Sequence, residues 1–167
     1  MEMIRRANSG DIDALLALWH EMMETHKGMH PDFRVSENAD VVVASNFTGL
    51  FDDPSSTIFV AEEEEKVVGM LIAQVRIGLS YTATIKSGYI RDVSVTGEYR
   101  RSGIGMKLVE AGIEFLESYD VEYIDLITGS VNDASNDFWA KMGFDETLKV
   151  RTRYISQDLI KKKPNNS

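Results

Sequence analysis

The residues best suited to chemistry form one run, Arg100-Arg101-Ser102-Gly103-Ile104-Gly105. It stands where an apolar, β-rich segment ends and an amphipathic helical pattern begins. At such a junction the first N–H groups of the helix point outward unpaired, the helix dipole adds positive charge, and glycines let phosphate oxygens approach the backbone. Arginine adds charge-assisted hydrogen bonds. The run therefore suits an anion, although a lone Gly-x-Gly is more often a plain strand-to-helix turn.

Two familiar phosphate motifs do not account for this run. A Walker loop requires Gly-x-x-x-x-Gly-Lys-Ser/Thr, which the chain lacks, and the dinucleotide fingerprint requires a third glycine where the chain has Leu108. A second block of interest follows later in the chain and consists of Asn132, Ala134, Phe138, Trp139, Lys141, Gly143 and Phe144. The order of the two blocks is more informative than either block alone.

Together the two blocks resemble the GNAT superfamily of acyl-CoA-dependent N-acetyltransferases. Arg100-x-x-Gly103-x-Gly105 matches the superfamily's Arg/Gln-x-x-Gly-x-Gly/Ala signature, and the second block matches its Asn followed by a helix ending in aromatic-x-Lys-x-Gly-Phe. The opening Ile4-Arg5-Arg6-Ala7 with Asp11-Ile12, and Val67-Val68-Gly69, are similar to its first strand, first helix and third strand. The resemblance spans residues 3–157.

The resemblance implies that acetyl-CoA is the co-substrate. It implies that the backbone of Val93 and Val95 pairs with the pantetheine arm, that the amides of residues 101–105 hold the pyrophosphate, and that the Asn132 side chain binds the pantetheine; a simple helix cap at Asn132 is compatible with that role. The implied cofactor-binding residues are Val93, Ser94, Val95, Arg100, Arg101, Ser102, Gly103, Ile104, Gly105, Met106, Asn132 and Trp139.

Acetyl transfer to an amine needs a base for the amine proton and a proton for the departing thiolate. The superfamily often places a Glu on its fourth strand, where this chain has Arg91 beside Asp92. Asp92 is the candidate base. Two alternatives stay open: Asp92 is a structural carboxylate paired with an arginine such as Arg91 or Arg153, or water removes the amine proton. Trp139 stands where the superfamily often has a Tyr that acts as the general acid. The indole N–H of Trp139 is too weak an acid to protonate a thiolate. Tyr154 is the candidate acid, and Tyr89 is the alternative.

The chain has no cysteine, which excludes disulfides, thiolate metal sites and an acyl-cysteine intermediate. His26 and His30 have the spacing of zinc ligands on a helix, but Gly28 and Pro31 argue against a helix there and no third ligand follows. We therefore expect no metal. We instead expect the loop that contains His26, His30 and Phe33 to border the acceptor pocket, with His30 or Phe33 in contact with the substrate.

The elements that must position these residues follow from periodicity and from turn residues. Strands are expected at 3–7, 57–61, 67–77, 88–95, 123–128 and 150–155, the second and third joined by a solvated turn of four glutamates; helices are expected from Ile12 to about Thr25, within 37–51, after Gly103 and through about Met142. We predict an α/β (α+β) fold: a GNAT-like single domain at 3–157, with a mixed sheet of about six or seven strands flanked by about four helices, and a disordered tail at 158–167.

Composition narrows the partners. With 167 residues, 43% hydrophobic and 27% charged, the chain suits one globular domain. Its 18 basic and 27 acidic residues give a net charge of −9, which disfavours nucleic acid and is compatible with a cationic substrate. The N-terminus resembles neither a signal peptide nor a membrane span, so we expect a cytoplasmic protein with no membrane partner.

The resulting hypothesis is direct acetyl transfer from acetyl-CoA to a primary amine of a small molecule or peptide, with no covalent acyl-enzyme. A non-catalytic acyl-CoA-binding or sensing module is the main alternative, because Arg91 and Trp139 stand where a base and an acid are expected. A third possibility is an interaction protein that uses the fold as a scaffold. The resemblance leaves a homodimer open.

Overall fold

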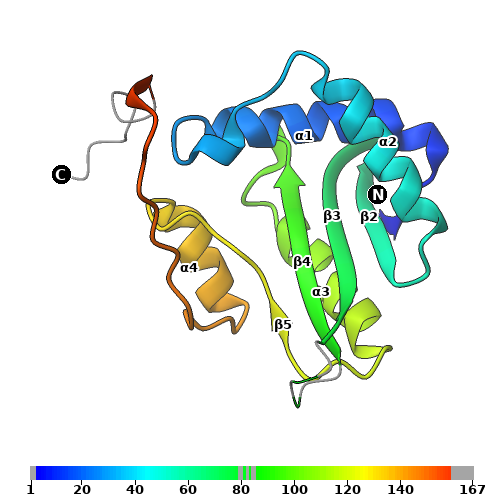
Figure 1. Cartoon of the computed structure of the whole chain (residues 1–167). Helices are drawn as coiled ribbons and strands as arrows, with labels where there is room; N and C mark the ends of the chain where they lie inside the picture. The colour runs from blue at the N-terminus through cyan, green and yellow to red at the C-terminus, as the bar shows by residue number, and fades with distance from the viewer. Residues whose placement is uncertain (1–2, 79–80, 82, 84–85, 159–167) are drawn as a thin grey trace. The chain divides into compact units, whose positions relative to one another are not determined.

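The computed structural model describes residues 3–78, 81, 83 and 86–158. The chain divides into two compact units, one made of Met1–Met22 and Glu37–Ile127 and the other of Met23–Ser36 and Thr128–Ser167. The first unit contains the sheet, and the second contains the last helix (Figure 1). The predicted tail lies outside the described residues from position 159 onward.

Among the described residues the sheet has five strands, in the order β1-β2-β3-β4-β5. Neighbours from β1 to β4 are antiparallel, and β5 pairs with β4 in parallel. The strands are β1 (Met3–Arg6), β2 (Ser56–Glu63), β3 (Lys66–Ile77), β4 (Lys86–Val95) and β5 (Ile124–Asp125). This is the mixed α+β sheet expected from the sequence, with fewer strands than the six or seven predicted.

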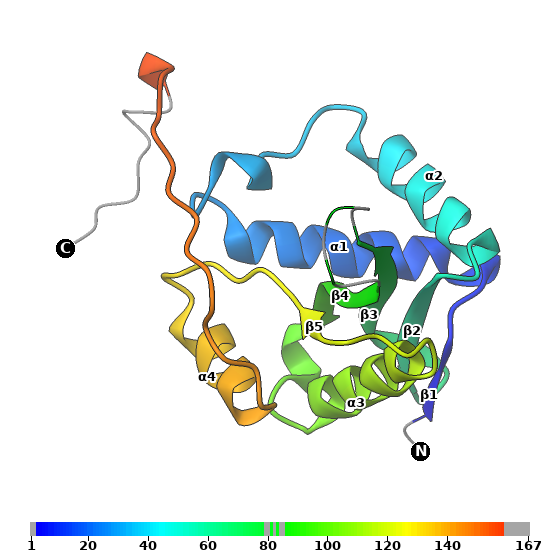
Figure 2. The same ribbon diagram turned by 60° about the horizontal axis from the view of Figure 1, so that its bottom comes forward.

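The helices that the structure describes are α1 (Ile12–His26), α2 (Ala39–Asp52), α3 (Ile104–Glu117) and α4 (Asp133–Lys141). Short 3-10 turns occur at η1 (Ser9–Asp11), η2 (Pro31–Phe33) and η3 (Gly97–Tyr99). In Figure 2, α1 and α2 lie on one side of the sheet and α3 on the other. No helix among the residues that the structure describes is long and apolar enough to cross a membrane.

Each face of the sheet has its own packing. On the α1/α2 face the buried cluster consists of Leu15, Leu18, Phe47, Leu50, Ile58, Val60, Met70 and Ile72. On the opposite face α3 lies so close that a Cβ added at Gly112 would be 2.7 Å from Leu71 Cδ2. The glycine therefore sets how closely α3 approaches β3, and with it the position of the N-terminus of α3.

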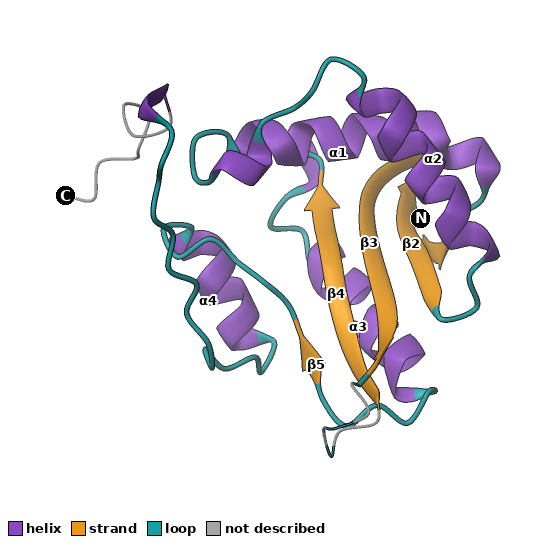
Figure 3. Ribbon diagram, in the orientation of Figure 1, coloured by secondary structure: helices purple, strands orange, loops and turns teal. Residues whose placement is uncertain are grey.

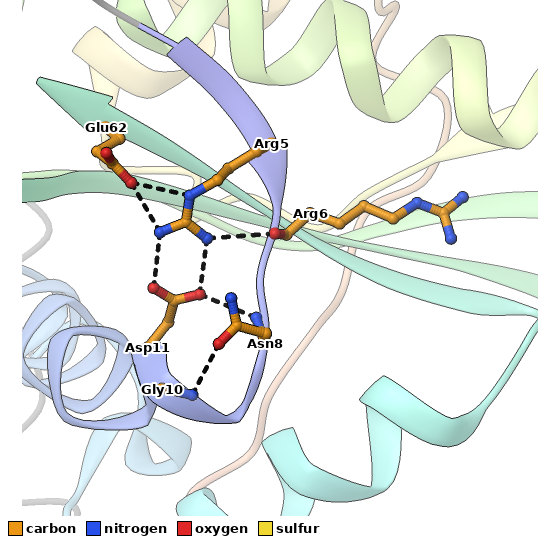
Figure 4. Close-up of polar contacts among 6 residues, drawn as sticks. All are labelled: Arg5, Arg6, Asn8, Gly10, Asp11 and Glu62. Carbon is orange, nitrogen blue, oxygen red and sulfur yellow. Dashed lines mark hydrogen bonds and ion pairs between the residues drawn. The ribbon is translucent and has the colours of Figure 1, made fainter. Parts of the chain in front are cut away.

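An ion-pair cluster ties β1 and β2 to the start of α1 (Figure 4). The Arg5 guanidinium donates to both Asp11 carboxylate oxygens and to Glu62 Oε2, all at 2.8 Å. Asp11 also accepts the Asn8 N–H at 2.9 Å, completing a capping box around η1. The hydrogen bond from Arg5 lowers the pKa of Asp11, against the opposing effect of its burial.

One strand prediction is wrong, and a second is wrong in its extent. Figure 3 draws the predicted strand at 150–155 as a loop, and it has no ladder partner among the described residues. Val150 and Ile155 in this segment are 78% and 75% exposed. Its alternating sequence suits a strand, but a strand exists only where a neighbour completes its backbone hydrogen bonds. The predicted strand at 123–128 is reduced to the two residues of β5 for the same reason, since only they pair with β4.

The predicted turn of four glutamates is also wrong in its extent. Glu62 and Glu63 continue β2, and only Glu64 and Glu65 form the tight turn, with φ of 50° and 64°. Glu62 is held in the strand by its ion pair with Arg5. Charge alone predicts exposure, whereas the nearby cation makes this position half-buried.

Candidate functional site

The last part of β4 has one unpaired edge. β4 pairs with β5 only at Gly88 and Tyr89, so from Ile90 to Val95 the edge away from β3 has no strand partner among the described residues. The Thr96 N–H donates to Val68 O at 2.9 Å, toward β3. Since backbone groups alternate along a strand, Val93 and Val95 turn theirs to the open edge. A peptide-like chain could extend the sheet there.

The run 100–105 follows this open edge directly and leads into α3. Gly103 is the N-cap of α3 and has a φ of +93°, a left-handed conformation that a side chain would strain. In the described chain, the N–H groups of residues 101–105 donate no backbone hydrogen bond. The predicted anion-binding geometry is therefore present at the beginning of a 14-residue helix.

The two arginines of the run have different surroundings. Arg100 Nε donates to Val95 O and its Nη2 to Glu21 Oε1, both at 2.9 Å. Arg101 is exposed, has a φ of +63°, and makes no hydrogen bond or ion pair with the described residues. Arg101 therefore carries the guanidinium that is available to a phosphate, while Arg100 is occupied within the fold.

Two serines predicted to bind cofactor direct their hydroxyls into the protein. Ser94 Oγ is buried and donates to Leu18 O at 3.2 Å, and Ser102 Oγ donates to Tyr99 O at 2.6 Å. Ile104 is buried in the α3 packing, whereas Met106 is 47% exposed. If Ser94 or Ser102 contacts a cofactor, the contact is made by its backbone. The assignment of both serines to cofactor binding stays a prediction.

A β-bulge in β4 places Arg91 and Asp92 side by side. Ile72 pairs with Asp92 and Ala73 with Ile90, which leaves Arg91 as the extra residue. Arg91 Nε donates to Asp92 Oδ2 at 2.7 Å, and its Nη1 donates to Asn46 Oδ1 of α2 at 2.8 Å. Strict alternation along a strand would point these neighbours to opposite faces, and the bulge breaks that alternation.

The second unit holds the remaining predicted cofactor residues. Asn132 caps α4, its Oδ1 accepting the Ser135 N–H at 3.2 Å, so the helix-cap interpretation is confirmed. Trp139 is buried, with its ring centroid 5.1 Å from that of Phe138 and 5.3 Å from that of Phe144. Trp139 therefore fills the interior of this unit, and its contact with a cofactor stays a prediction.

The predicted acceptor residues also lie in the second unit. His30 caps η2 by accepting the Asp32 N–H, and its Nε2 is 3.3 Å from Thr152 Oγ1. Phe33 stacks on His26, with centroids 4.8 Å apart. No group of three metal-ligating side chains occurs in the part of the chain that the structure describes. Contact of His30 or Phe33 with substrate stays a prediction.

Tyr154, the candidate acid, is half-buried in the irregular segment that replaces the predicted last strand. Its hydroxyl forms no hydrogen bond with the described residues.

The first unit brings Asp92, the open edge of β4 and the start of α3 into one continuous stretch. Sequence reasoning missed Glu21 there, because a glutamate on the polar side of a helix carries no signal of a partner 79 residues away.

The family model of the GNAT acetyltransferases matches residues 16–144. This range contains the bulge, the open edge of β4, the glycine run and α4. The chain therefore belongs to the GNAT acetyltransferase family.

Curated relatives carry related names. An N-alpha-acetyltransferase of Sulfurisphaera tokodaii is 30% identical over 104 residues, which cover 59% of this chain and 62% of the relative. An uncharacterized N-acetyltransferase of Archaeoglobus fulgidus is 27% identical over 137 residues, covering 82% of this chain and 88% of the relative. The chain thus spans less than two thirds of the length of the first of these relatives.

Solved structures share the fold at lower identity. A protein from Bacillus halodurans superposes with a TM-score of 0.82 at 24% identity, over 92% of this chain and 99% of the other. An aminoglycoside N-acetyltransferase in complex with CoA superposes with a TM-score of 0.73 at 16% identity, over 94% of this chain and 95% of the other. At these identities the likeness supports the fold alone.

Proposed function

We propose that this protein is an N-acetyltransferase that moves the acetyl group of acetyl-CoA directly to a primary amine of a small molecule or peptide. One observation carries the proposal: the edge of β4 at Val93 and the Val95 N–H has no strand partner among the described residues, and it is followed by the amides of residues 101–105, which donate no backbone hydrogen bond to those residues. An extended ligand with amides in one part and a diphosphate in the next suits that sequence of groups.

The residues present fit acetyl-CoA. The backbone of Val93 and the Val95 N–H are oriented to pair with pantetheine amides, while the amides of 101–105 and the Arg101 guanidinium suit the diphosphate. Acetyl-CoA, when bound, supplies the acetyl group as an activated thioester. Ile104 anchors α3 in the packing against the sheet, which fixes the direction of the amides.

The proton transfers are assigned to Asp92 and Tyr154. Asp92 accepts the Arg91 hydrogen bond on Oδ2, and its Oδ1 accepts none from the described residues, so Oδ1 is available for a proton of the acceptor ammonium. The neutral amine nitrogen would then form a bond to the thioester carbonyl carbon as the carbon–sulfur bond breaks, and the nitrogen would lose its second proton to water. The thiolate would leave with the electron pair and take a proton, for which Tyr154 is the candidate donor.

Two kinds of acceptor have support. The Sulfurisphaera tokodaii relative is named for action on an α-amine, and a structural neighbour from an uncultured soil metagenomic sample is an aminoglycoside acetyltransferase in complex with sisomicin. Both names describe amine acceptors, and the net charge of −9 favours a cationic one. We therefore propose a cationic primary amine, either an amino sugar or a peptide amine.

Thermal unfolding with and without acetyl-CoA tests the cofactor. At about 100 times its dissociation constant a ligand stabilises the folded state by about 2.7 kcal/mol, which for a chain of this size raises Tm by roughly 5–11 °C. Gly103→Glu places a carboxylate and a strained residue at the proposed diphosphate position and should abolish the shift while the protein remains folded. An unchanged Tm of the natural protein at saturating acetyl-CoA contradicts the proposal.

One observation favours a second candidate, a non-catalytic acyl-CoA-binding module. Arg91 occupies the position at which the family often has a carboxylate, and it engages the neighbouring Asp92. Measuring thiol release from acetyl-CoA over a panel of amino sugars, polyamines and peptides separates the two. Amine-dependent release above the hydrolysis rate supports the enzyme, and binding without release over the whole panel supports the module.

A further inference from the structure

Glu21 connects α1 to the turn that follows β4. Its Oε1 accepts the Gly97 N–H at 2.8 Å and Arg100 Nη2 at 2.9 Å, so one carboxylate oxygen holds both a backbone and a side-chain group of the turn. Glu21 is 76 residues from Gly97 in the sequence. The two bonds fix a segment that would otherwise be anchored mainly by its own backbone.

Arg100 completes the link. Its Nε donates to Val95 O at 2.9 Å, the last carbonyl of β4, while its Nη2 reaches Glu21. The Arg100 guanidinium thus connects the end of β4 to α1, across the η3 turn. Arg100 N–H also donates to Gly97 O at 3.4 Å. The residues just before the unbonded amides of 101–105 are held on three sides: by β4, by α1 and by their own 3-10 turn.

This arrangement also sets the local charge. The Glu21 carboxylate offsets the Arg100 guanidinium, and the Arg100 and Glu21 side chains are 44% and 35% exposed. The positive charge available to an anion is therefore that of Arg101 and of the N-terminus of α3. A phosphate-binding turn works by presenting amides in a fixed direction, so rigidity of the preceding residues matters more than one further cation.

We propose that Glu21 is a positioning residue for the part of the site that binds the diphosphate of acetyl-CoA. It holds Gly97 and Arg100, and through them it fixes the direction of the amides of residues 101–105 without touching the ligand. The inference rests on the proposed function and deepens it. The affinity for the diphosphate then depends partly on α1, a helix on which no phosphate contact is expected.

The test compares Glu21→Ala, Glu21→Gln and the matched control Glu24→Ala, an exposed glutamate of α1 that pairs with Lys27. Calorimetry measures the Kd of CoA, and chemical-shift titration measures that of pantetheine, which lacks the diphosphate. Glu21→Ala should weaken CoA about tenfold, the equivalent of one charge-assisted hydrogen bond, and leave pantetheine unchanged. Glu21→Gln keeps an oxygen acceptor for Gly97 and should lie within about threefold of the natural protein.

Hydrogen exchange without ligand provides an independent readout. The Gly97 amide should exchange faster in Glu21→Ala than in the natural protein or Glu24→Ala, because it loses its acceptor. Equal weakening of CoA and pantetheine, unchanged CoA affinity in Glu21→Ala, or an unchanged Gly97 exchange rate each overturns the inference while acetyl-CoA binding by the natural protein stands. A natural protein that binds no CoA overturns the proposed function and this inference together.

Discussion

The Asp92 carboxylate has two competing uses, a structural pair with Arg91 and a base for the acceptor amine. The bulge decides that both side chains meet, since Arg91 is the residue left without a partner in the β3–β4 ladder. The pair occupies only Oδ2 of Asp92. A structural role and a chemical role are therefore compatible at this residue, and a substitution that preserves shape can separate them.

Asp92→Asn makes that separation. An amide oxygen still accepts the Arg91 hydrogen bond, but an amide does not take a proton at neutral pH. If Asp92 is the base, kcat falls by about 10²- to 10⁴-fold with little change in Tm. Amine-dependent thiol release from acetyl-CoA is the measurement. Activity within a few-fold of the natural protein contradicts the assignment and leaves deprotonation to water.

Tyr154 requires a separate experiment, because no contact in the structure supports its role. Tyr154→Phe removes only the hydroxyl, so an acid at this position predicts a loss in kcat with the affinity for CoA unchanged. A variant with the natural kcat excludes Tyr154 as the proton donor.

At the scale of elements, the close approach of α3 to the sheet is encoded by a residue that is poor for helices. Glycine inside a helix costs about 1 kcal/mol relative to alanine, so helix propensity alone predicts that replacing it is stabilising. At Gly112 the added Cβ would lie 2.7 Å from Leu71 Cδ2 and 3.2 Å from Leu71 Cδ1. Leu71 is fully buried, so it has little freedom to move.

Gly112→Ala should therefore destabilise the protein by about 1–2 kcal/mol, since overpacking outweighs the gain in propensity. Gly49 of α2 is the matched control, because its added Cβ would have no atom of the described residues within 4 Å apart from its chain neighbours and the backbone of its own helix. Gly49→Ala should stabilise by about 0.5–1 kcal/mol. Urea unfolding of both variants measures the two signs. The same sign at both positions shows that packing against Leu71 is not what selects the glycine.

At the scale of the molecule, the Arg5–Asp11–Glu62 cluster joins the first strand, the second strand and the start of the first helix. These segments come together only in the folded state, so the cluster links folding to pH. Asp11 has a lowered pKa in the folded state because of the hydrogen bond from Arg5. A lowered pKa means that the stabilisation is present above the unfolded-state pKa of about 3.9 and is lost as the pH falls below it.

Asp11→Asn should cost about 1–2 kcal/mol of unfolding free energy at pH 7, and the difference from the natural protein should shrink steadily from about pH 4 to pH 3. Urea unfolding across this range measures it. Asp13→Asn, an exposed carboxylate in the first turn of α1, controls for the change in net charge. A difference that is the same at pH 3 and pH 7 contradicts the link between this pair and pH.

Much of the fold was predictable from sequence because its signals are local. Capping residues, glycine and proline placed both ends of α1, the start of α3 and the end of α4 within one or two residues of their observed positions, and α2 formed despite its run of three valines. Gly143 follows α4 with a left-handed backbone, a φ of +86°, a conformation with which glycine commonly ends a helix. The anion-binding run was predictable for the same reason, since a strand, a glycine turn and a helix N-terminus are contiguous in the chain.

Only the tertiary structure decided the features that depend on distant partners. The bulge that joins Arg91 to Asp92 depends on the register against β3, and the hold of Glu21 on Arg100 depends on how α1 crosses the sheet. The alternating segment at 150–155 reads as a strand in sequence and yet has no ladder among the described residues. The sequence determined the family, the helices, most of the strands and the chemical groups that could bind a ligand. Register and packing determined which of those groups are already bonded to the protein and which stay available to a ligand, because a hydrogen bond depends on distance in space rather than on separation along the chain.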